Sequence, residues 1–278
     1  MSLANENKEQ NTLVENYKQT KSELIDQSLQ QACATGDCEN CFKDGKLDYK
    51  KEYSDEFYSE YIKNFKTNAK KRYVYRFFKR FFDILFSLLL LIILSPVFII
   101  TSIAILCDSK GGVIFKQKRL GRGGKPFNCY KFRSMYVSAP KNCATSLLNN
   151  PEKYLTRVGK VIRKLSIDEL PQLWCVFIGT MSFIGYRPLV LTEEKCNDMR
   201  NALGVFKMRP GISGYAQVYG RDDVHYKNKA IMDAEYVNKA SLWLDLKLVF
   251  KTVGVVFNRK GNHDDKKKKQ KKRLKYER

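Results

Sequence analysis

The sequence predicts an α+β fold: a mostly helical monotopic membrane protein with a re-entrant membrane helix, a short β-hairpin and interfacial amphipathic helices. Three observations lead to this prediction. A long uncharged run, Ile84 to Cys107, is interrupted by Ser95 and Pro96. After this run, a glycine-rich turn separates two short strand-like segments. From Tyr154 onward, apolar residues recur mostly at helical spacing.

The composition indicates a folded chain with an anionic partner. The 278 residues are 44% hydrophobic and 29% charged, which is enough to bury a core in one or two domains. The formal net charge of +22 suits lipid head groups, a phosphorylated substrate or nucleic acid, and composition alone does not choose among them. The kind of anion therefore has to be judged from where the positive charge lies.

Eight cysteines are scattered along the chain, which indicates a reducing cytosol rather than a disulfide scaffold. Only Cys33, Cys38 and Cys41 cluster, and a metal site there would lack a fourth ligand because no histidine is near. We expect free thiols at these positions. Met1 to Lys70 is polar, so we expect no cleavable signal peptide and a retained apolar run.

Four parts follow from composition. Residues 1–69 form a polar, partly disordered extension with a few helix-compatible stretches, such as Glu52 to Phe65. Residues 70–110 hold a basic flank and the re-entrant membrane helix, and residues 111–258 form a cytoplasmic domain with the candidate catalytic residues. Residues 259–278 are a basic disordered tail, where Lys266 to Arg273 would bind RNA, DNA or acidic lipid. Beside a membrane segment we expect lipid, with a merely solvated tail as the alternative.

The apolar run is long enough to enter a bilayer, whose hydrocarbon core takes roughly 20 helical residues to cross. Both of its flanks are basic, and cytoplasmic flanks of membrane helices are enriched in Lys and Arg. Pro96 removes a backbone donor and bends a helix. A helix that enters and leaves on the same side reconciles these observations, and an ordinary kinked transmembrane helix is the alternative.

The soluble part begins with a predicted β-hairpin. Val113 to Leu120 and Phe127 to Phe132 flank a turn, Gly121 to Pro126. The turn lacks the spacing of a phosphate-binding loop. Helical patterns follow at Leu155 to Leu165, Leu170 to Phe183, Leu189 to Phe206, Ala230 to Ala240 and Leu242 to Phe257. The last pattern is amphipathic and predicts an interfacial helix or, equally, a helix that faces a core.

Two adjacent carboxylates, Asp168 and Glu169, follow the cations Arg163 and Lys164. A structural interpretation exists, because Ser166 and Glu169 match the capping box of a helix start. In the functional interpretation, one carboxylate attacks while the other binds a divalent ion, and Arg163 binds a phosphate. Chemistry on a pyrophosphate needs such cations, and the region supplies Lys131, Arg133, Arg163, Lys164, Arg187 and Arg209.

These motifs together resemble those of the bacterial sugar transferases, and more narrowly the monotopic polyprenyl-phosphate phosphoglycosyltransferases that start glycan assembly. The resemblance runs from about Arg76 to Val253. The segments that carry it are Lys79 to Asp83, Ser95-Pro96, Tyr130 to Met135, Leu165 to Gln172, Met181 to Gly185 and Arg209 to Arg221.

The resemblance implies an enzyme, a phosphoglycosyltransferase that transfers a sugar-1-phosphate from a UDP-sugar to undecaprenyl phosphate and releases UMP. It further implies a covalent phosphosugar-aspartate intermediate, Mg²⁺ as cofactor, and a role as the first membrane step of capsule, exopolysaccharide, O-antigen or glycoprotein assembly. The implied location is the cytoplasmic face of the bacterial inner membrane, with anionic lipid and downstream glycosyltransferases as partners and no nucleic acid.

Individual roles follow from the same resemblance. Asp168 corresponds to the nucleophile and Glu169 to the metal ligand; Arg163 and Lys131 correspond to phosphate-binding residues, and Arg187 to a nucleotide-binding residue. Ser95 and Pro96 correspond to the break of the membrane helix.

Two positions depart from the family pattern. Tyr186 stands where proline is usual, which affects the nucleotide end of the site, and Ser213 replaces a threonine. The competing hypothesis is a nonenzymatic membrane adaptor that binds RNA or acidic lipid through its basic tail.

Overall fold

The computed structural model describes residues 42–43, 46–47, 49, 53–65, 72–140, 151–220 and 224–258. Contacts divide the chain into an N-terminal unit, Met1–Lys66, and a C-terminal unit, Thr67–Arg278. The clustered cysteines at 33–41 and the basic tail at 259–278 lie outside the described residues.

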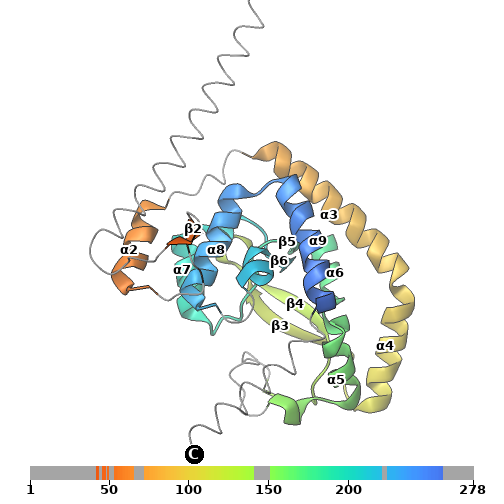
Figure 1. The fold of residues 1–278 in the computed structure, drawn as a ribbon. Coiled ribbons are helices and arrows are strands. Elements are labelled where there is room, and N and C mark those ends of the chain that lie inside the picture. Colours follow the sequence, from red (N-terminus) through yellow and green to blue (C-terminus); the bar gives the residue numbers. More distant parts are fainter. Residues whose placement is uncertain are drawn as a thin grey trace, which may run out of the picture. The chain divides into compact units, whose positions relative to one another are not determined.

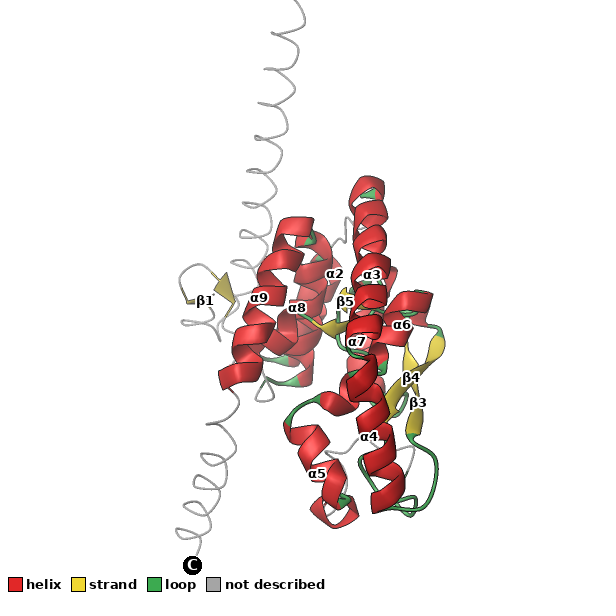
Figure 2. Cartoon of the chain, turned by 90° about the vertical axis from the view of Figure 1, so that its right-hand side faces the viewer, coloured by secondary structure: helices red, strands yellow, loops and turns green. Residues whose placement is uncertain are grey.

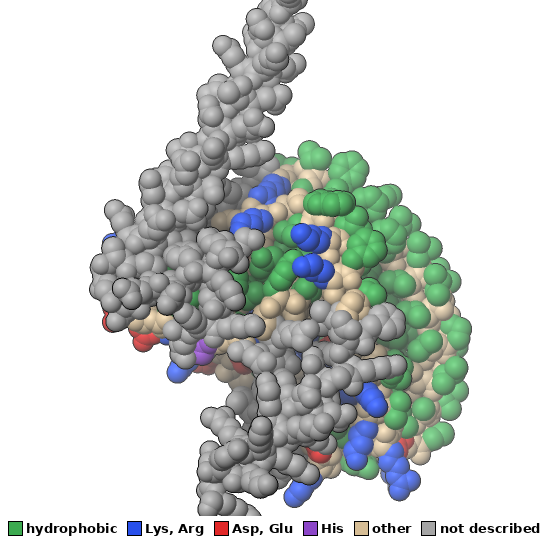
Figure 3. Space-filling model, viewed as in Figure 1, with side chains coloured by type: hydrophobic (Ala, Val, Ile, Leu, Met, Phe, Trp, Pro, Cys, Tyr) green, Lys and Arg blue, Asp and Glu red, His purple; other side chains and the backbone are tan. Residues whose placement is uncertain are grey.

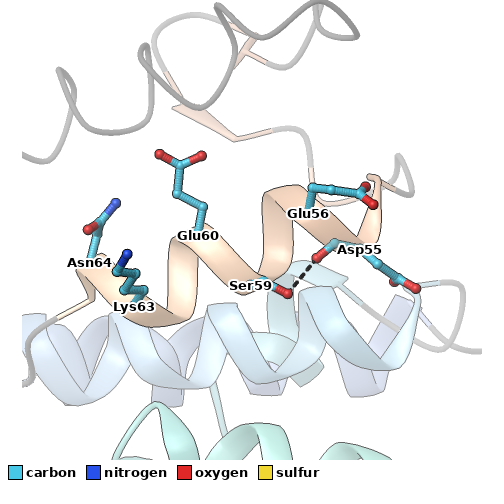
Figure 4. A pocket seen from close by; sticks show the side chains of 6 residues that line it. All are labelled: Asp55, Glu56, Ser59, Glu60, Lys63 and Asn64. Carbon is cyan, nitrogen blue, oxygen red and sulfur yellow. Dashed lines mark hydrogen bonds between the residues drawn. The ribbon is translucent and has the colours of Figure 1, made fainter.

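The N-terminal unit contains one described helix, α2 (Asp55–Asn64), and an antiparallel pair of two-residue strands, β1 (Phe42–Lys43) and β2 (Lys46–Leu47). The helix lies within the stretch predicted to be helical. Its N-terminus is capped by the Ser54 hydroxyl, which accepts from the Phe57 N–H at 3.3 Å. A shallow hollow runs along its polar face (Figure 4) and is lined by Asp55, Glu56, Ser59, Glu60, Lys63 and Asn64. None of the predicted site residues lies there.

Two consecutive helices, α3 (Tyr73–Ile93) and α4 (Ser95–Asp108), form an arc around one side of the C-terminal unit (Figure 1). Within the described residues, no single helix is both long and apolar enough to cross a membrane; α3 and α4 reach that length and composition only as a pair, bent by 59°. Large apolar side chains are exposed along both helices, and the matching edge of the surface is almost continuously hydrophobic (Figure 3).

The bend falls at Leu94, immediately before Ser95 and Pro96. Proline has no N–H, so Pro96 cannot donate to the carbonyl of Ile92 as a helical residue would. The Ser95 hydroxyl donates to that carbonyl instead, at 2.8 Å. The break therefore leaves this acceptor satisfied while the helix axis changes direction.

The predicted β-hairpin is confirmed. It consists of β3 (Ile114–Leu120) and β4 (Pro126–Phe132), which pair antiparallel with Ile114 opposite Phe132. The turn between them contains a short 3-10 helix, η2 (Arg122–Gly124), with positive φ at Gly123 and Gly124. In Figure 2 the hairpin lies beside α6, and α4 lies beside α5 (bounds of both below), as the contacts between these elements also show.

The remainder of the C-terminal unit is mostly helical, as expected. Its regular helices are α5 (Arg157–Lys164), α6 (Gln172–Ile178), α7 (Glu194–Ala202), α8 (Tyr226–Lys239) and α9 (Leu242–Asn258). Short 3-10 helices are η4 (Pro151–Tyr154), η5 (Ile167–Glu169) and η6 (Val205–Lys207), and η7 (Ala216–Gly220) is a single π-turn.

Two of the expected helices are too long. The helix predicted over Leu170 to Phe183 was wrong at its C-terminal end. Gly179 takes a left-handed conformation with φ 92° and ends α6. The pattern Leu189 to Phe206 is reduced to α7 and η6, which are separated by Gly204 with φ 69°. In both places a glycine with positive φ ends a helix whose apolar spacing continues.

A second, parallel sheet pairs β5 (Ser182–Ile184) with β6 (Gly211–Ser213), where the sequence predicted helix and turn. The backbones of the two strands approach so closely that a Cβ atom on Gly211 would lie 2.1 Å from the Gly185 nitrogen. Three-residue strands leave too short a pattern to recognise. The pairing therefore depends on glycines rather than on alternating apolar residues.

Buried charges attach α3 to the rest of the unit. Asp83 is 4% exposed and accepts from the Ser182 hydroxyl at 3.1 Å and the Phe183 N–H at 3.2 Å. Arg80 donates to the carbonyls of Val176 at 2.7 Å and Phe177 at 2.8 Å, near the end of α6. The polar first half of α3 is thus part of the folded unit.

Two helical glycines provide a matched test of packing. A Cβ on Gly159 in α5 would lie 1.9 Å from the Ser134 carbonyl oxygen, whereas a Cβ on Gly254 in α9 would meet nothing within 4 Å. We expect Gly159→Ala to lower the free energy of unfolding by about 2–3 kcal/mol or more, and Gly254→Ala to raise it by about 0.5–1 kcal/mol. Thermal unfolding of both variants in one detergent measures this, and shifts of the same sign would contradict it.

Candidate active site

The two predicted catalytic carboxylates lie on η5, a single turn between α5 and α6. Ser166, just before this turn, has φ 58° and is the one non-glycine residue with positive φ among the described residues. Its side chain makes no capping hydrogen bond, and the Glu169 N–H bonds instead to the Ser166 carbonyl at 3.3 Å. The capping-box interpretation is therefore wrong, because the left-handed turn points the hydroxyl elsewhere.

Asp168 and Glu169 have different surroundings. Asp168 is 7% exposed, and burial raises the pKa of its carboxyl group, as does Glu169, while Lys131 and Arg163 act in the opposite direction. For Glu169, burial alone would raise the pKa, but Arg187 and Lys131 outweigh it and hold the pKa well below its usual range. Glu169 is thus a firmly ionised carboxylate beside a second carboxylate that is more shielded from water.

Lys131 reaches this site from β4. Its Nζ lies 2.7 Å from Glu169 Oε1. Cys129, two residues earlier on the same face of the strand, is buried against Cys175, Val176 and Met181. Phe132, on the opposite face, is buried with Ile105 of α4 and Ile162 of α5. The strand is fixed on both faces, which holds the Lys131 ammonium group against η5.

Two arginines complete the electropositive surroundings. Arg187 Nη2 lies 3.2 Å from Glu169 Oε1, the oxygen that also contacts Lys131. The Arg187 side chain is 41% exposed, so part of its guanidinium faces solvent. Arg163, in the last turn of α5, acts electrostatically on Asp168. The structure therefore brings together all five predicted site residues, Lys131, Arg163, Asp168, Glu169 and Arg187.

Two other cations from the predicted set have structural partners instead. Arg133 donates to the carbonyls of Ser109 at 2.7 Å and Lys110 at 2.5 Å, just after α4. Arg209 donates from Nε to the Gly179 carbonyl at 2.8 Å. Ser95 and Pro96, predicted as the membrane helix break, lie at the bend between α3 and α4.

Sequence reasoning missed Arg119 and Arg200, whose guanidiniums contact the chain around Arg187. Arg119 Nη1 donates to the Pro188 carbonyl at 2.6 Å, and Arg200 Nη1 donates to the Arg187 carbonyl at 2.9 Å. No motif marks either residue. Arg119 sits in the expected polar alternation of a strand, and Arg200 in the expected pattern of a helix.

The departure at Tyr186 does not alter the open side of the site. Tyr186 is 1% exposed, with its ring centroid 5.5 Å from that of Phe206. Its side chain therefore lies in the core and not beside the exposed guanidinium of Arg187. The other departure, Ser213, bonds through its hydroxyl to that of Thr252 at 2.7 Å, which joins β6 to α9.

The carboxylates suit a metal that is shared with a substrate. Among the described residues, no three His, Cys, Asp or Glu side chains form a metal-binding cluster. Mg²⁺ usually binds through one or two carboxylates together with substrate phosphates and water. Asp168 and Glu169 supply hard oxygen ligands beside cations that attract phosphate. The residues fit Mg²⁺ in that form and not in an all-protein cage.

Comparison with known proteins identifies a family. The family described as "Bacterial sugar transferase" matches residues 74–259. The "Undecaprenyl-phosphate galactose phosphotransferase" of Salmonella typhimurium is 40% identical over 187 residues, which cover 62% of this chain and 38% of that protein. The "UDP-galactose-lipid carrier transferase" of Erwinia amylovora is 38% identical over 186 residues, which cover 61% of this chain and 38% of that protein. The chain thus spans about two fifths of the length of these relatives.

A shorter relative is matched over most of its length. The "Exopolysaccharide production protein ExoY" of Rhizobium meliloti is 35% identical over 187 residues, which cover 62% of this chain and 82% of ExoY.

The left-handed Ser166 allows a test of the turn that carries the carboxylates. A non-glycine residue in this conformation costs about 1 kcal/mol or more, which glycine avoids. We expect Ser166→Gly to raise the unfolding temperature. The control is Ser241→Gly. Ser241 precedes α9, and its hydroxyl accepts from the Leu244 N–H at 3.2 Å, so its loss should lower the unfolding temperature slightly. A Ser166→Gly protein that unfolds at a lower temperature than the unmodified protein would show that the conformation carries no strain.

Proposed function

Because the chain belongs to the bacterial sugar transferase family, we propose that it is a phosphoglycosyltransferase that transfers a sugar-1-phosphate from a UDP-sugar to undecaprenyl phosphate and releases UMP. The observation that carries this proposal is the cluster of Lys131, Glu169 and Arg187 beside the buried carboxyl group of Asp168. The names of the relatives supply the two substrate classes, undecaprenyl phosphate and a UDP-sugar.

Asp168 acts as the nucleophile. Its carboxylate oxygen attacks the phosphorus next to the sugar, the bond from that phosphorus to the bridging oxygen breaks, and UMP leaves with the electron pair. In the second step an oxygen of undecaprenyl phosphate attacks the same phosphorus and releases the Asp168 carboxylate. One carboxylate thus serves a water-soluble donor and a lipid acceptor in turn.

The cations balance the charge of the diphosphate. Lys131 and Arg163 bind phosphate oxygens, and Arg187, which faces solvent, binds at the nucleotide end. Glu169 would hold Mg²⁺, and the bound ion would supply positive charge to offset the negative charge of the phosphates. The contacts of Glu169 with Lys131 and Arg187 keep its carboxylate ionised for that role.

Both ends of the bent helix pair are tied to the same folded unit, which supports a re-entrant arrangement. Arg72, the N-cap residue of α3, donates to the carbonyls of Asn238 and Ala240, and Asp108 of α4 accepts from the Val158 N–H of α5 at 2.9 Å. A helix whose two ends are fixed to one body cannot place them on opposite sides of a bilayer. We infer that the pair enters and leaves the membrane on one side. The Lys and Arg residues on both flanks of the apolar run favour the cytoplasmic face of the bacterial inner membrane.

A second apolar surface supports an interfacial position for α9. Trp243 is 76% exposed and Phe250 68% exposed, and Leu246 and Val253 are exposed at the same helical spacing. The Lys251 ammonium lies 4.2 Å from the ring centroid of Tyr219. We infer that this face of α9 lies in the head-group region, where anionic lipid attracts the Lys251 ammonium group.

The product suits the start of glycan assembly, because a sugar linked to undecaprenyl diphosphate retains free hydroxyl groups. Glycosyltransferases that extend lipid-linked sugars would consume it. The relatives' names include exopolysaccharide production, which is one of the pathways that such a step would supply.

Replacing the nucleophile tests the activity. Full-length protein with Mg²⁺, undecaprenyl phosphate and a panel of UDP-sugars should release UMP, and Asp168→Asn should lower the rate by on the order of 10³-fold or more, since an amide does not attack phosphorus. With a UDP-sugar alone, intact-protein mass spectrometry should detect a phosphosugar adduct that Asp168→Asn lacks.

Asp198→Asn is the matched control, because Asp198 is an exposed carboxylate on α7 with the same chemistry. It should keep normal turnover. Undiminished turnover by Asp168→Asn would disprove the mechanism, and salt-sensitive RNA binding without UMP release for any donor would favour the adaptor hypothesis.

The re-entrant arrangement has its own test. Labels placed before Lys70 and after Arg259 should both react from the cytoplasm. The double variant Ser95→Ala/Pro96→Ala allows a continuous hydrogen-bond pattern at the bend. Straightening the pair breaks the contacts at one of its ends, so part of the population should shift to a spanning form in which one label becomes periplasmic. The control Ser102→Ala removes a hydroxyl bonded to the Phe98 carbonyl at 2.6 Å, away from the bend. Opposite label positions in the unmodified protein would contradict the proposal.

A further inference from the structure

The backbone that carries Arg187 is held by a fully buried ion pair. Arg200 of α7 and Asp233 of α8 have side chains 2% and 1% exposed, with 2.5 Å between Nη2 and Oδ2. The other terminal nitrogen of Arg200 donates to the Arg187 carbonyl at 2.9 Å. One guanidinium thus links the core of the α7–α8 pair to the peptide of a residue that contacts Glu169.

An aromatic ring closes the remaining side of this guanidinium. The Cζ atom of Arg200 lies 5.5 Å from the ring centroid of Tyr186, the residue before Arg187. The Tyr186 hydroxyl is buried and has no hydrogen-bond partner among the described residues. Leaving a buried hydroxyl unpaired costs free energy. The position therefore uses the ring of Tyr186 against Arg200, and not its hydroxyl.

Stability alone is a poor explanation for the pair. Removing two charges from water is costly, and apolar residues of similar volume often replace a buried ion pair with no loss of stability. An apolar side chain could not donate to the Arg187 carbonyl. The planar fork of arginine does so while it holds a carboxylate.

The next peptide is held in the same way from the other side. Arg119 of β3 donates to the Pro188 carbonyl at 2.6 Å, and the Leu120 N–H donates to the Leu189 carbonyl at 3.2 Å. Two successive carbonyls, those of Arg187 and Pro188, therefore each accept from a guanidinium. The side chain of Arg187 is left 41% exposed beside Glu169, on a backbone that both arginines fix.

We propose that Arg200, held by Asp233 and packed on Tyr186, is a positioning residue that fixes Arg187 for binding the diphosphate of the nucleotide-sugar donor. This inference rests on the proposed function. Arg200 touches no substrate; it acts through the backbone of Arg187. Its loss should therefore weaken donor binding more than it slows the chemical steps at Asp168.

The double variant Arg200→Met/Asp233→Leu separates positioning from folding. It replaces both charges with apolar side chains, so it should unfold at or above the temperature of the unmodified protein. The donor KM should rise about tenfold, while kcat at saturating donor changes much less, since a misplaced binding group costs affinity first. A folded double variant with an unchanged donor KM would overturn the proposal.

Two further variants serve as controls, and a third is a second test of the proposal. Val237→Ala makes a cavity on α8, one turn from Asp233 and 1% exposed, and should lower stability without changing the donor KM. Tyr186→Phe keeps the ring and removes the unpaired hydroxyl, so it should leave the KM unchanged at equal or higher stability. If the double variant does not fold, Arg200→Lys keeps the charge but loses the fork; a raised donor KM is expected, and an unchanged one overturns the proposal.

Amide hydrogen exchange gives a readout that does not need activity. Peptides covering residues 185–190 should exchange faster in the double variant than in Val237→Ala, because the Arg187 carbonyl has lost its donor. If the unmodified protein releases no UMP from any donor, the proposed function fails, and exchange alone decides the positioning role. Equal exchange in the two variants would overturn it.

Discussion

The fixed alternation of side chains along β4 is the constraint on which the rest of the C-terminal unit depends. Cys129 and Lys131 face η5 and α6, while Phe132 faces Ile105 of α4 and Ile162 of α5. A shift of one residue would exchange these faces, burying the Lys131 ammonium in an apolar cluster and removing it from Glu169. The same register thus places the Lys131 ammonium beside Glu169 and packs α4 against the rest of the unit.

Three arginines of the unit donate to backbone carbonyls at or just after helix ends. Arg72 donates to the carbonyls of Asn238 and Ala240 at the end of α8, Arg80 to those of Val176 and Phe177 near the end of α6, and Arg133 to those that follow α4. The last carbonyls of a helix lack internal partners and carry the negative end of its dipole. A guanidinium satisfies two of them at once, so several short helices can end within a small unit.

This use of arginine limits what the charge of the sequence can predict. Lys131, Arg163 and Arg187 were assigned to the site through the family motifs, and in the structure they act on Glu169 or Asp168. Arg133 and Arg209 belonged to the same predicted set of cations, but their partners are backbone carbonyls distant in the sequence. The hairpin and α9 were predictable from regular patterns. The β5–β6 pair was not, because its close approach depends on Gly185 and Gly211, whose role appears only when both strands are in place.

The bend between α3 and α4 divides the apolar segment into two shorter helices, and both ends of the pair remain bonded to the same folded unit. At about 1.5 Å per residue, the 14 residues of α4 extend about 21 Å, less than the roughly 30 Å hydrocarbon core. Within hydrocarbon, every backbone group at a break must find a partner in the protein. Here the Leu94 N–H bonds to the Leu90 carbonyl at 2.9 Å, the Phe98 N–H to the Leu94 carbonyl at 3.0 Å, and the Ser95 hydroxyl to the Ile92 carbonyl that Pro96 cannot reach. Serine before proline thus keeps the Ile92 carbonyl paired at the bend, and the hydrogen bonds of Arg72 and Asp108 tie both ends of the pair to one folded unit.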